Sequence, residues 1–238
     1  LTAVNTIIPA LMSGNAVILK HASQTLLVGE RFAAAMHRAQ LPPGLFQNLL
    51  LDHDQTAAII AGGQVQQVNF TGSVDAGRAM ESAATGRFLG MGLELGGKDP
   101  AYVRADAHLE HAVENLVDGS FFNSGQSCCA VERIYVDQKI YPAFIERFAD
   151  LTRQYVLGNP LDPATTLGPL VTPGAAVFVR AQIAEALAQG AKTLIDPKAF
   201  PIDVPGSAYL APQVLVDVNH QIYDIKNEKK KKKKKKKK

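Results

Sequence analysis

The residues best suited to covalent chemistry in this 238-residue sequence are two adjacent cysteines, Cys128 and Cys129. They follow 123–127, a run of small and polar residues between a predicted helix and a predicted strand. A partly ionised thiol is a stronger nucleophile than a hydroxyl, and the exposed backbone amides of such a loop can hold an oxyanion. A buried, inert thiol is the alternative. Since neighbouring side chains of an extended segment point to opposite faces, we expect one cysteine in the core and one in a cleft.

The second candidate is Glu94, which ends an apolar run and is followed by Gly96, Gly97 and Lys98. At the end of a buried strand, desolvation would make a carboxylate a stronger base, as general-base catalysis requires. A strand-end carboxylate held by backbone amides or by Lys98 explains the pattern equally well. The residue types alone leave these two interpretations open.

The third candidate is a phosphate site at Phe70-Thr71-Gly72-Ser73, where a predicted strand passes into a helix that contains Gly77. The start of a helix offers unpaired amides and a positive dipole end, and glycine lets the backbone come close to a ligand. The simpler alternative is a turn followed by a helix cap. His108 and His111, three apart on one predicted helix, lack a third ligand nearby, so we expect a solvated pair and no metal.

Hydrophobic periodicity predicts the elements that must position these residues. Helices are predicted over about 1–11, 24–39, 74–84, 109–122, 141–155 and 173–189, with a short one after Asp54. Strands are predicted at 16–19, at 46–51, up to Phe70, at 88–95 and at 134–136. Such alternation favours parallel strands joined by helical crossovers. We therefore expect an α/β protein with an open, mainly parallel sheet and a domain seam near Gly96.

Composition limits the setting in which this protein works. No apolar run approaches the roughly 18 residues that span a bilayer, and adjacent cysteines cannot cross-link distant parts of a fold. We expect a cytoplasmic protein with no membrane partner. Residues 229–238 are all lysine and more than account for the formal charge of +3. They could bind nucleic acid or anionic lipid, but we interpret them as a translated poly-A artefact and expect no nucleic-acid partner.

Together these motifs closely resemble the aldehyde dehydrogenase superfamily. The family signatures read Glu-Leu-Gly-Gly-Lys, which selects Glu94, and Gly-Gln-x-Cys, which selects Cys128 over Cys129 through Gly125-Gln126-Ser127. The segments Pro9-Ala10-Leu11-Met12 and Leu167-Gly168-Pro169 look like further family landmarks. The resemblance extends from Leu1 to about 220.

The resemblance implies NAD(P)-dependent oxidation of a small-molecule aldehyde to a carboxylic acid. Cys128 would form a thiohemiacetal whose oxyanion is held partly by its own backbone amide, and Glu94 would activate water to hydrolyse the resulting thioester. The implied cofactor-binding residues are Lys20, Ser23, Gly72, Ser73, Gly77 and Leu95. Many family members carry glutamate where Ser23 stands, and that carboxylate repels a 2′-phosphate. The expected cofactor is therefore NAD or NADP.

The resemblance also implies a Rossmann-like dinucleotide-binding domain at 1–95 and an incomplete α/β catalytic domain at 96–228, which the lysine tail at 229–238 follows. The family's Pro-Trp-Asn and Glu-x-Phe-Gly-Pro segments are expected before residue 1 and near 228, so we expect an inactive fragment of a homo-oligomeric enzyme, a dimer or tetramer. Two alternatives are a CoA-acylating semialdehyde dehydrogenase and a non-catalytic remnant of a dehydrogenase. Glu94 favours hydrolysis over release to CoA.

Overall fold

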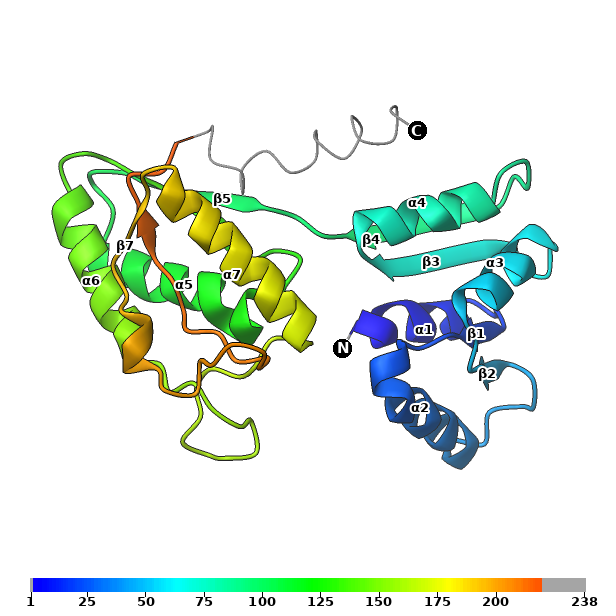
Figure 1. Ribbon diagram of the computed structural model, residues 1–238. Helices are drawn as coiled ribbons and strands as arrows, with labels where there is room; N and C mark the ends of the chain where they lie inside the picture. Colours follow the sequence, from blue (N-terminus) through cyan, green and yellow to red (C-terminus); the bar gives the residue numbers. More distant parts are fainter. Residues whose placement is uncertain (1, 220–238) are drawn as a thin grey trace, which may run out of the picture. The chain divides into compact units, whose positions relative to one another are not determined.

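The structure, a computed structural model, describes residues 2–219 (Figure 1). Its elements fall into two compact units with the boundary between Gly96 and Gly97, which we call unit 1 and unit 2. That boundary lies at the glycine pair where the sequence predicted a domain seam. The roles assigned to the two domains stay predictions, and the predicted lysine tail lies outside the described residues.

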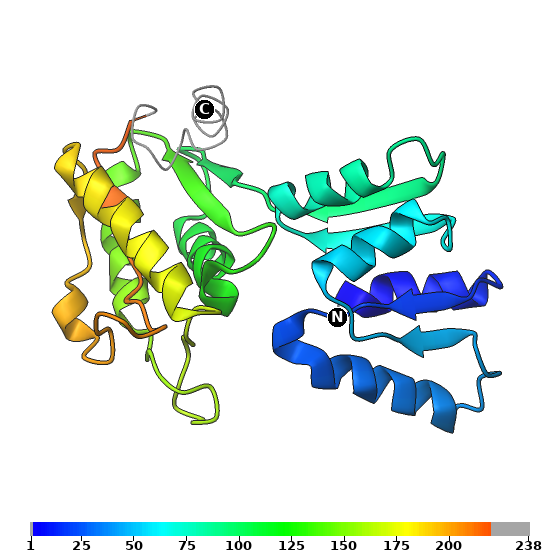
Figure 2. The same ribbon diagram turned by 45° about the vertical axis from the view of Figure 1, so that its right-hand side comes forward.

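Unit 1 alternates helices with strands that pair in parallel. Its elements are α1 Thr2–Met12, β1 Val17–Leu19, the 3-10 helix η1 Ser23–Thr25, α2 Leu26–Arg38, β2 Phe46–Asn48, α3 His53–Ala61, β3 Gln67–Gly72, α4 Val74–Ala83 and β4 Gly90–Leu95. β1 pairs with β2, and β3 pairs with β4. Figure 2 shows α2 against β2 and α4 against β3. This arrangement confirms the predicted α/β class.

Local side-chain bonds set the ends of the helices in unit 1. The Asp52 carboxylate accepts from the Gln55 backbone N–H at 2.7 Å, and the Gln55 side chain accepts from the Asp52 N–H at 3.0 Å. This capping box starts α3 at His53 rather than after Asp54. At the end of α1, Gly14 takes a φ of +80°, which only glycine adopts without strain.

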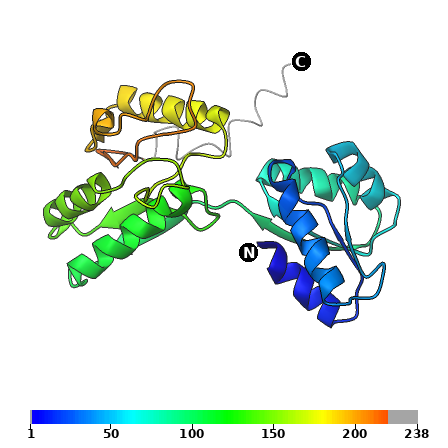
Figure 3. The same ribbon diagram turned by 90° about the horizontal axis from the view of Figure 1, so that it is seen from below.

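Unit 2 contains a parallel strand pair and a short antiparallel one. Its elements are β5 Asp99–Val103, α5 Leu109–Phe121, the 3-10 segment η2 Phe122–Gly125, β6 Val131–Val136, α6 Tyr141–Arg153, α7 Pro173–Ala188, β7 Lys192–Thr193, the 3-10 helix η3 Pro197–Ala199 and β8 Leu215–Val216. β5 pairs in parallel with β6, and β7 pairs antiparallel with β8. Figure 3 shows α7 apart from the pair α5 and α6.

The main core of unit 2 packs α5 and α6 against the β5–β6 pair. Its buried members are Val103, Val113, Val117, Phe144 and Phe148. Full burial of each such side chain contributes roughly 1.5–3 kcal/mol, so this cluster is a strong anchor. Phe121 at the end of α5 and Ile134 of β6 pack against it, so the cluster holds the two elements that flank the cysteine pair.

The structure corrects several predicted elements. β5 was not predicted, because it opens with the weak strand formers Asp99 and Pro100. β3 continues to Gly72 instead of ending at Phe70, since its pairing with β4 holds to the last residue. His108 and His111 do not share a helix. His108 caps α5, and its ring Nδ1 accepts from the His111 backbone N–H at 3.2 Å.

None of the helices within residues 2–219 combines the length and the apolar character needed to cross a membrane.

Candidate nucleophile turn and dinucleotide site

The segment before the cysteines adopts three successive left-handed backbone conformations. The φ angles are +51° at Asn123, +58° at Ser124 and +72° at Gly125. Glycine takes this region freely, but for other residues it costs roughly 1–2 kcal/mol each. Contacts elsewhere in unit 2 must therefore hold the segment in place.

On the helix side, Phe121 anchors this segment to the core. Its ring meets Tyr155 edge-on, with centroids 5.6 Å apart, and lies 6.4 Å from the ring of Phe148. Burial, and to a lesser degree the charge of Asp118, raises the pKa of Tyr155. The last turn of α5 is thus a fixed starting point for the left-handed run.

Side chains of the left-handed run and of Gln126 bond to a second segment, 168–171. The Ser124 hydroxyl donates to the Gly168 carbonyl at 2.8 Å. The Gln126 side-chain amide donates to the Pro169 carbonyl at 3.3 Å and accepts from the Val171 N–H at 2.6 Å. These contacts cross more than forty positions of sequence, and spacing alone did not predict them. The only hint in the sequence is that both segments carry motifs of the family, Gly-Gln-x-Cys in the first and Leu167-Gly168-Pro169 in the second.

Cys128 and Cys129 lie in a turn, and both are exposed. The Ala130 N–H donates to the Ser127 carbonyl at 3.2 Å and closes the turn. The expectation of one core and one exposed cysteine was wrong, because it assumed an extended backbone in which neighbours alternate. Exposure leaves both thiols accessible to a reagent, and the Cys129 Sγ lies 3.5 Å from the Ser127 hydroxyl.

The glycine pair after Glu94 reaches the cysteine turn through Gly97. A Cβ placed on Gly97 would lie 2.6 Å from the Cys128 carbonyl oxygen, far inside van der Waals contact. Lys98 pairs with Glu132, the second residue of β6, rather than with Glu94. Within unit 2, Gly97 of the first motif therefore packs against the turn that carries the cysteines, and Lys98 pairs with the strand that follows this turn.

Glu94 itself belongs to unit 1, near the end of β4. It pairs in register with Thr71, and the next pair is Leu95 with Gly72. Its side chain is exposed, so the interpretation of Glu94 as a buried carboxylate, one of the two that the sequence left open, is wrong. The alternation of β4 turns the partly buried Leu93 and Leu95 to one side and Glu94 to the other.

The predicted phosphate site lies at the junction of β3 and α4. Ser73 caps α4, and its hydroxyl accepts from the Ala76 N–H at 3.2 Å. Gly77, one turn into the helix, is buried, and a Cβ there would lie 2.8 Å from a Leu95 methyl carbon. This close approach of helix to strand is what a glycine provides in dinucleotide-binding units. Gly72 packs beside the Phe70 ring.

Lys20 and Ser23 follow the carboxyl end of β1. The Leu49 N–H donates to the Leu19 carbonyl at 2.9 Å, which holds the end of β1 to the segment after β2. Lys20 is half-buried, and Ser23 opens η1 with an exposed side chain. The predicted cofactor residues thus occupy the ends of β1, β3 and β4 and the start of α4. Ligands of α/β sheets bind beyond the carboxyl ends of strands, so these residues fit a dinucleotide.

Unit 2 also contains a hollow of about 1130 Å³. Its walls include Phe144 and Phe148 of α6, Phe178 of α7, and the back of the turn at Ser124. Cys128 does not line this hollow. The hollow is therefore not part of the candidate nucleophile site.

Unit 1 has parallel strand pairs with helical crossovers and a helix that starts behind a glycine and a serine, and unit 2 carries an accessible thiol on a tethered turn. The fold is that of an α/β protein. The sequence profile of the Aldehyde dehydrogenase family matches residues 1–229, and the chain belongs to that family.

Similar proteins fit this assignment. The chain is 38% identical over 221 residues to a betaine aldehyde dehydrogenase of Agrobacterium fabrum, which covers 92% of this chain and 45% of the relative. It is 37% identical over 216 residues to a succinate-semialdehyde dehydrogenase [NADP(+)] of Mycolicibacterium paratuberculosis, covering 91% and 45%. The crystal structure of lactaldehyde dehydrogenase from Escherichia coli superposes with a TM-score of 0.86 at 32% identity, covering 93% and 46%. The chain spans about 45% of the length of the curated relatives it matches.

Proposed function

We propose that this chain carries the nucleophile and the general base for oxidation of an aldehyde to a carboxylic acid. Cys128 is the nucleophile and Glu94 is the base. The observation that carries the proposal is the contact between Gly97 and the Cys128 carbonyl. It brings the segment that directly follows the Glu94 strand against the turn that holds an exposed thiol.

The Cys128 thiolate attacks the aldehyde carbonyl and forms a thiohemiacetal, while its own backbone N–H stabilises the oxyanion. A bound nicotinamide dinucleotide would supply the acceptor for the hydride on this carbon, which leaves the acyl group on sulfur as a thioester. The Glu94 carboxylate then takes a proton from water, which adds to the thioester and releases the acid and the thiolate. Exposure of Glu94 at the end of β4 gives its carboxylate access to that water.

For the cofactor we propose NAD or NADP, bound by Lys20, Ser23 and the start of α4. The adenosine ribose would lie near Lys20, and the pyrophosphate would lie at Gly72 and Ser73. Ser23 presents a hydroxyl, which does not repel a 2′-phosphate as a carboxylate would. The NADP(+) in the name of the mycobacterial relative supports the inclusion of NADP.

The first experiment separates the two cysteines by substitution. It uses the chain itself and a chimera in which the chain replaces the matching segment of the Agrobacterium fabrum relative. Cys128→Ala should abolish aldehyde oxidation by the chimera, because the acyl group then has no carrier. Cys129→Ala, the matched control one residue away, should keep most of the activity. Mass spectrometry after iodoacetamide treatment should locate the reactive thiol at Cys128, and the opposite ranking of the two variants would sink the assignment.

A further inference from the structure

Gln126 uses both ends of its side-chain amide to join the cysteine turn to a second segment of unit 2. Its Nε2 donates to the Asn123 carbonyl at 3.1 Å and to the Pro169 carbonyl at 3.3 Å, and its Oε1 accepts from the Val171 N–H at 2.6 Å. We propose that Gln126 is a positioning residue, which holds the thiol and N–H of Cys128 in the geometry that acyl transfer needs. This inference rests on the proposed role of Cys128 as nucleophile.

The backbone before Cys128 needs such a tie because it does not favour its own conformation. Asn123 and Ser124 are both held in the left-handed region. The Asn123 side chain donates to the Gln126 carbonyl at 3.1 Å, and the Gln126 N–H donates to the Asn123 carbonyl at the same distance. Without the Gln126 side chain, this small loop loses its connection to Pro169 and Val171. The strained residues can then relax and carry Cys128 with them.

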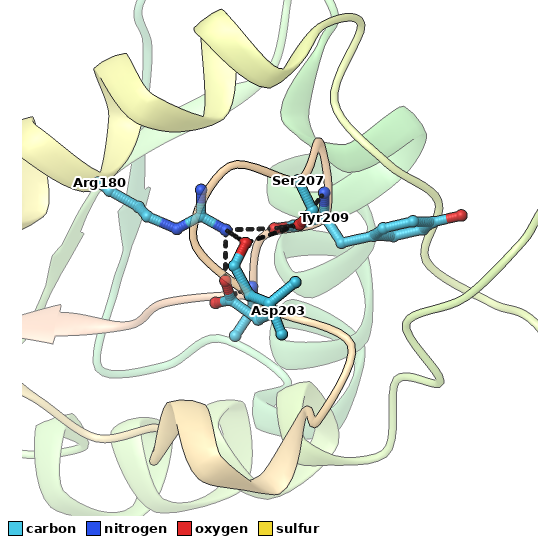
Figure 4. A network of polar contacts seen from close by, with 6 residues as sticks. Arg180, Asp203, Ser207 and Tyr209 are labelled. Atoms are coloured by element: carbon cyan, nitrogen blue, oxygen red, sulfur yellow. Dashed lines mark hydrogen bonds and ion pairs between the residues drawn. The ribbon is translucent and has the colours of Figure 1, made fainter.

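The second segment is suited to act as an anchor, since it is fixed by bonds of its own. The Leu170 N–H donates to the Ala208 carbonyl at 2.9 Å. Ala208 stands in sequence between Ser207 and Tyr209, two residues that Figure 4 shows beside Arg180. Ser124 adds a parallel tie through its 2.8 Å bond to Gly168.

Arg180 fastens that loop to α7. Its Nη2 donates to the Asp203 carboxylate and to the Tyr209 carbonyl, both at 2.5 Å (Figure 4). The other Asp203 oxygen accepts from the Ala211 N–H at 2.9 Å. The Asp203 side chain is only 10% exposed, so this ion pair is shielded from water and salt. The connection from Cys128 through Gln126 therefore ends on a rigid part of the unit.

Two reagents distinguish positioning from mere accessibility. p-Nitrophenyl acetate acylates a thiolate through an oxyanion: the sulfur bonds to the acetyl carbon, p-nitrophenolate leaves, and a thioester remains. Its rate depends on the alignment of the Cys128 N–H with that oxyanion. Iodoacetamide alkylates the same thiolate by displacement of iodide and needs no oxyanion site. A residue that only keeps the protein folded affects both rates alike.

The experiment uses the 238-residue chain in a Cys129→Ala background, with Gln126→Met as the test variant. Methionine keeps the length of the side chain and removes its hydrogen bonds. Acylation of Cys128 should fall by about tenfold or more, while alkylation should change by less than about twofold. Gln189→Met is the matched control, because the Gln189 amide bonds to Glu185 one turn earlier in α7. Both of its rates should match the parent.

Ser124→Ala removes the parallel tie to Gly168, and it carries the test if Gln126→Met does not fold. It should show the same selective loss of acylation. Rates that stay unchanged, or that change by one common factor, would overturn the role of Gln126. If Cys128→Ala leaves acylation intact, the proposed nucleophile itself is wrong, which is a separate failure from that of Gln126.

Discussion

Glu94 combines two features that matter for a base acting on water: it stands near the end of a paired strand, and its carboxylate is exposed. We predict that Glu94→Gln in the chimera slows thioester hydrolysis by roughly a hundredfold and leaves hydride transfer nearly intact. Glutamine is isosteric but cannot take the proton from water. Stopped-flow spectroscopy should therefore show a burst of reduced cofactor followed by slow turnover. Glu81→Gln on α4 serves as the control and should turn over like the parent. If Glu94→Gln abolished the burst of reduced cofactor while thioester hydrolysis stayed fast, Glu94 would not be the base that activates water.

At the scale of elements, the close approach of the segment before β5 to the cysteine turn can be tested with one methyl group. Gly97→Ala places a Cβ 2.6 Å from the Cys128 carbonyl, whereas a Cβ on Gly96 meets nothing within 4 Å. We predict that Gly97→Ala lowers the free energy of unfolding by about 1–3 kcal/mol, as overpacking does, and displaces the Cys128 turn.

Urea unfolding should show that loss, and acylation by p-nitrophenyl acetate should slow in the same variant. Gly96→Ala is the matched control, one residue away and free of the clash, and both of its measurements should stay close to the parent. Equal behaviour of the two variants would mean that the turn does not depend on close packing at Gly97.

The elements were more predictable from the sequence than the contacts between them. Helices with clear end signals were predicted within a few residues of their true ends, such as α7, which Thr172 caps and Pro173 opens. β5 was missed, because its strand character comes from pairing with β6 and from burial of Val103 rather than from its own residues. Tertiary pairing overrides local propensity in such segments.

In the candidate site, too, the identity of the residues was more predictable than the contacts and the exposure of their side chains. The resemblance to the family signatures selected Cys128 and Glu94, whereas the residue pattern alone predicted one cysteine in the core and offered a buried carboxylate as one of two interpretations of Glu94. Both errors came from the assumption of extended backbone or of burial on both faces of a strand. The left-handed turn at 123–125 and the side-chain exposure on β4 depend on contacts from distant segments, which local patterns do not encode.

At the scale of the whole chain, the two units bury apolar side chains to different extents. Among the described residues, the buried hydrophobic side chains of unit 1 are Ile7, Ile60 and Met80, whereas unit 2 contains all of the buried clusters. Regions with more buried apolar contact open less often. Unit 2 should therefore resist local opening better than unit 1 when no ligand is present.

We predict that backbone amides of α5, α6 and β6 exchange their hydrogens most slowly, and that amides of unit 1 exchange sooner. A ligand that binds only the folded state raises protection where it binds, by about 2.7 kcal/mol at a hundredfold excess over Kd. Saturating NADP or NAD should thus slow exchange at the start of α4 and around Lys20, and should leave α5 and α6 unchanged. Hydrogen exchange read by mass spectrometry tests both statements on the same sample, with adenosine alone as the ligand control. Uniform exchange across both units would contradict the difference in their cores. Unchanged exchange at α4 under saturating cofactor would contradict the binding site proposed in unit 1, whatever the outcome at Cys128.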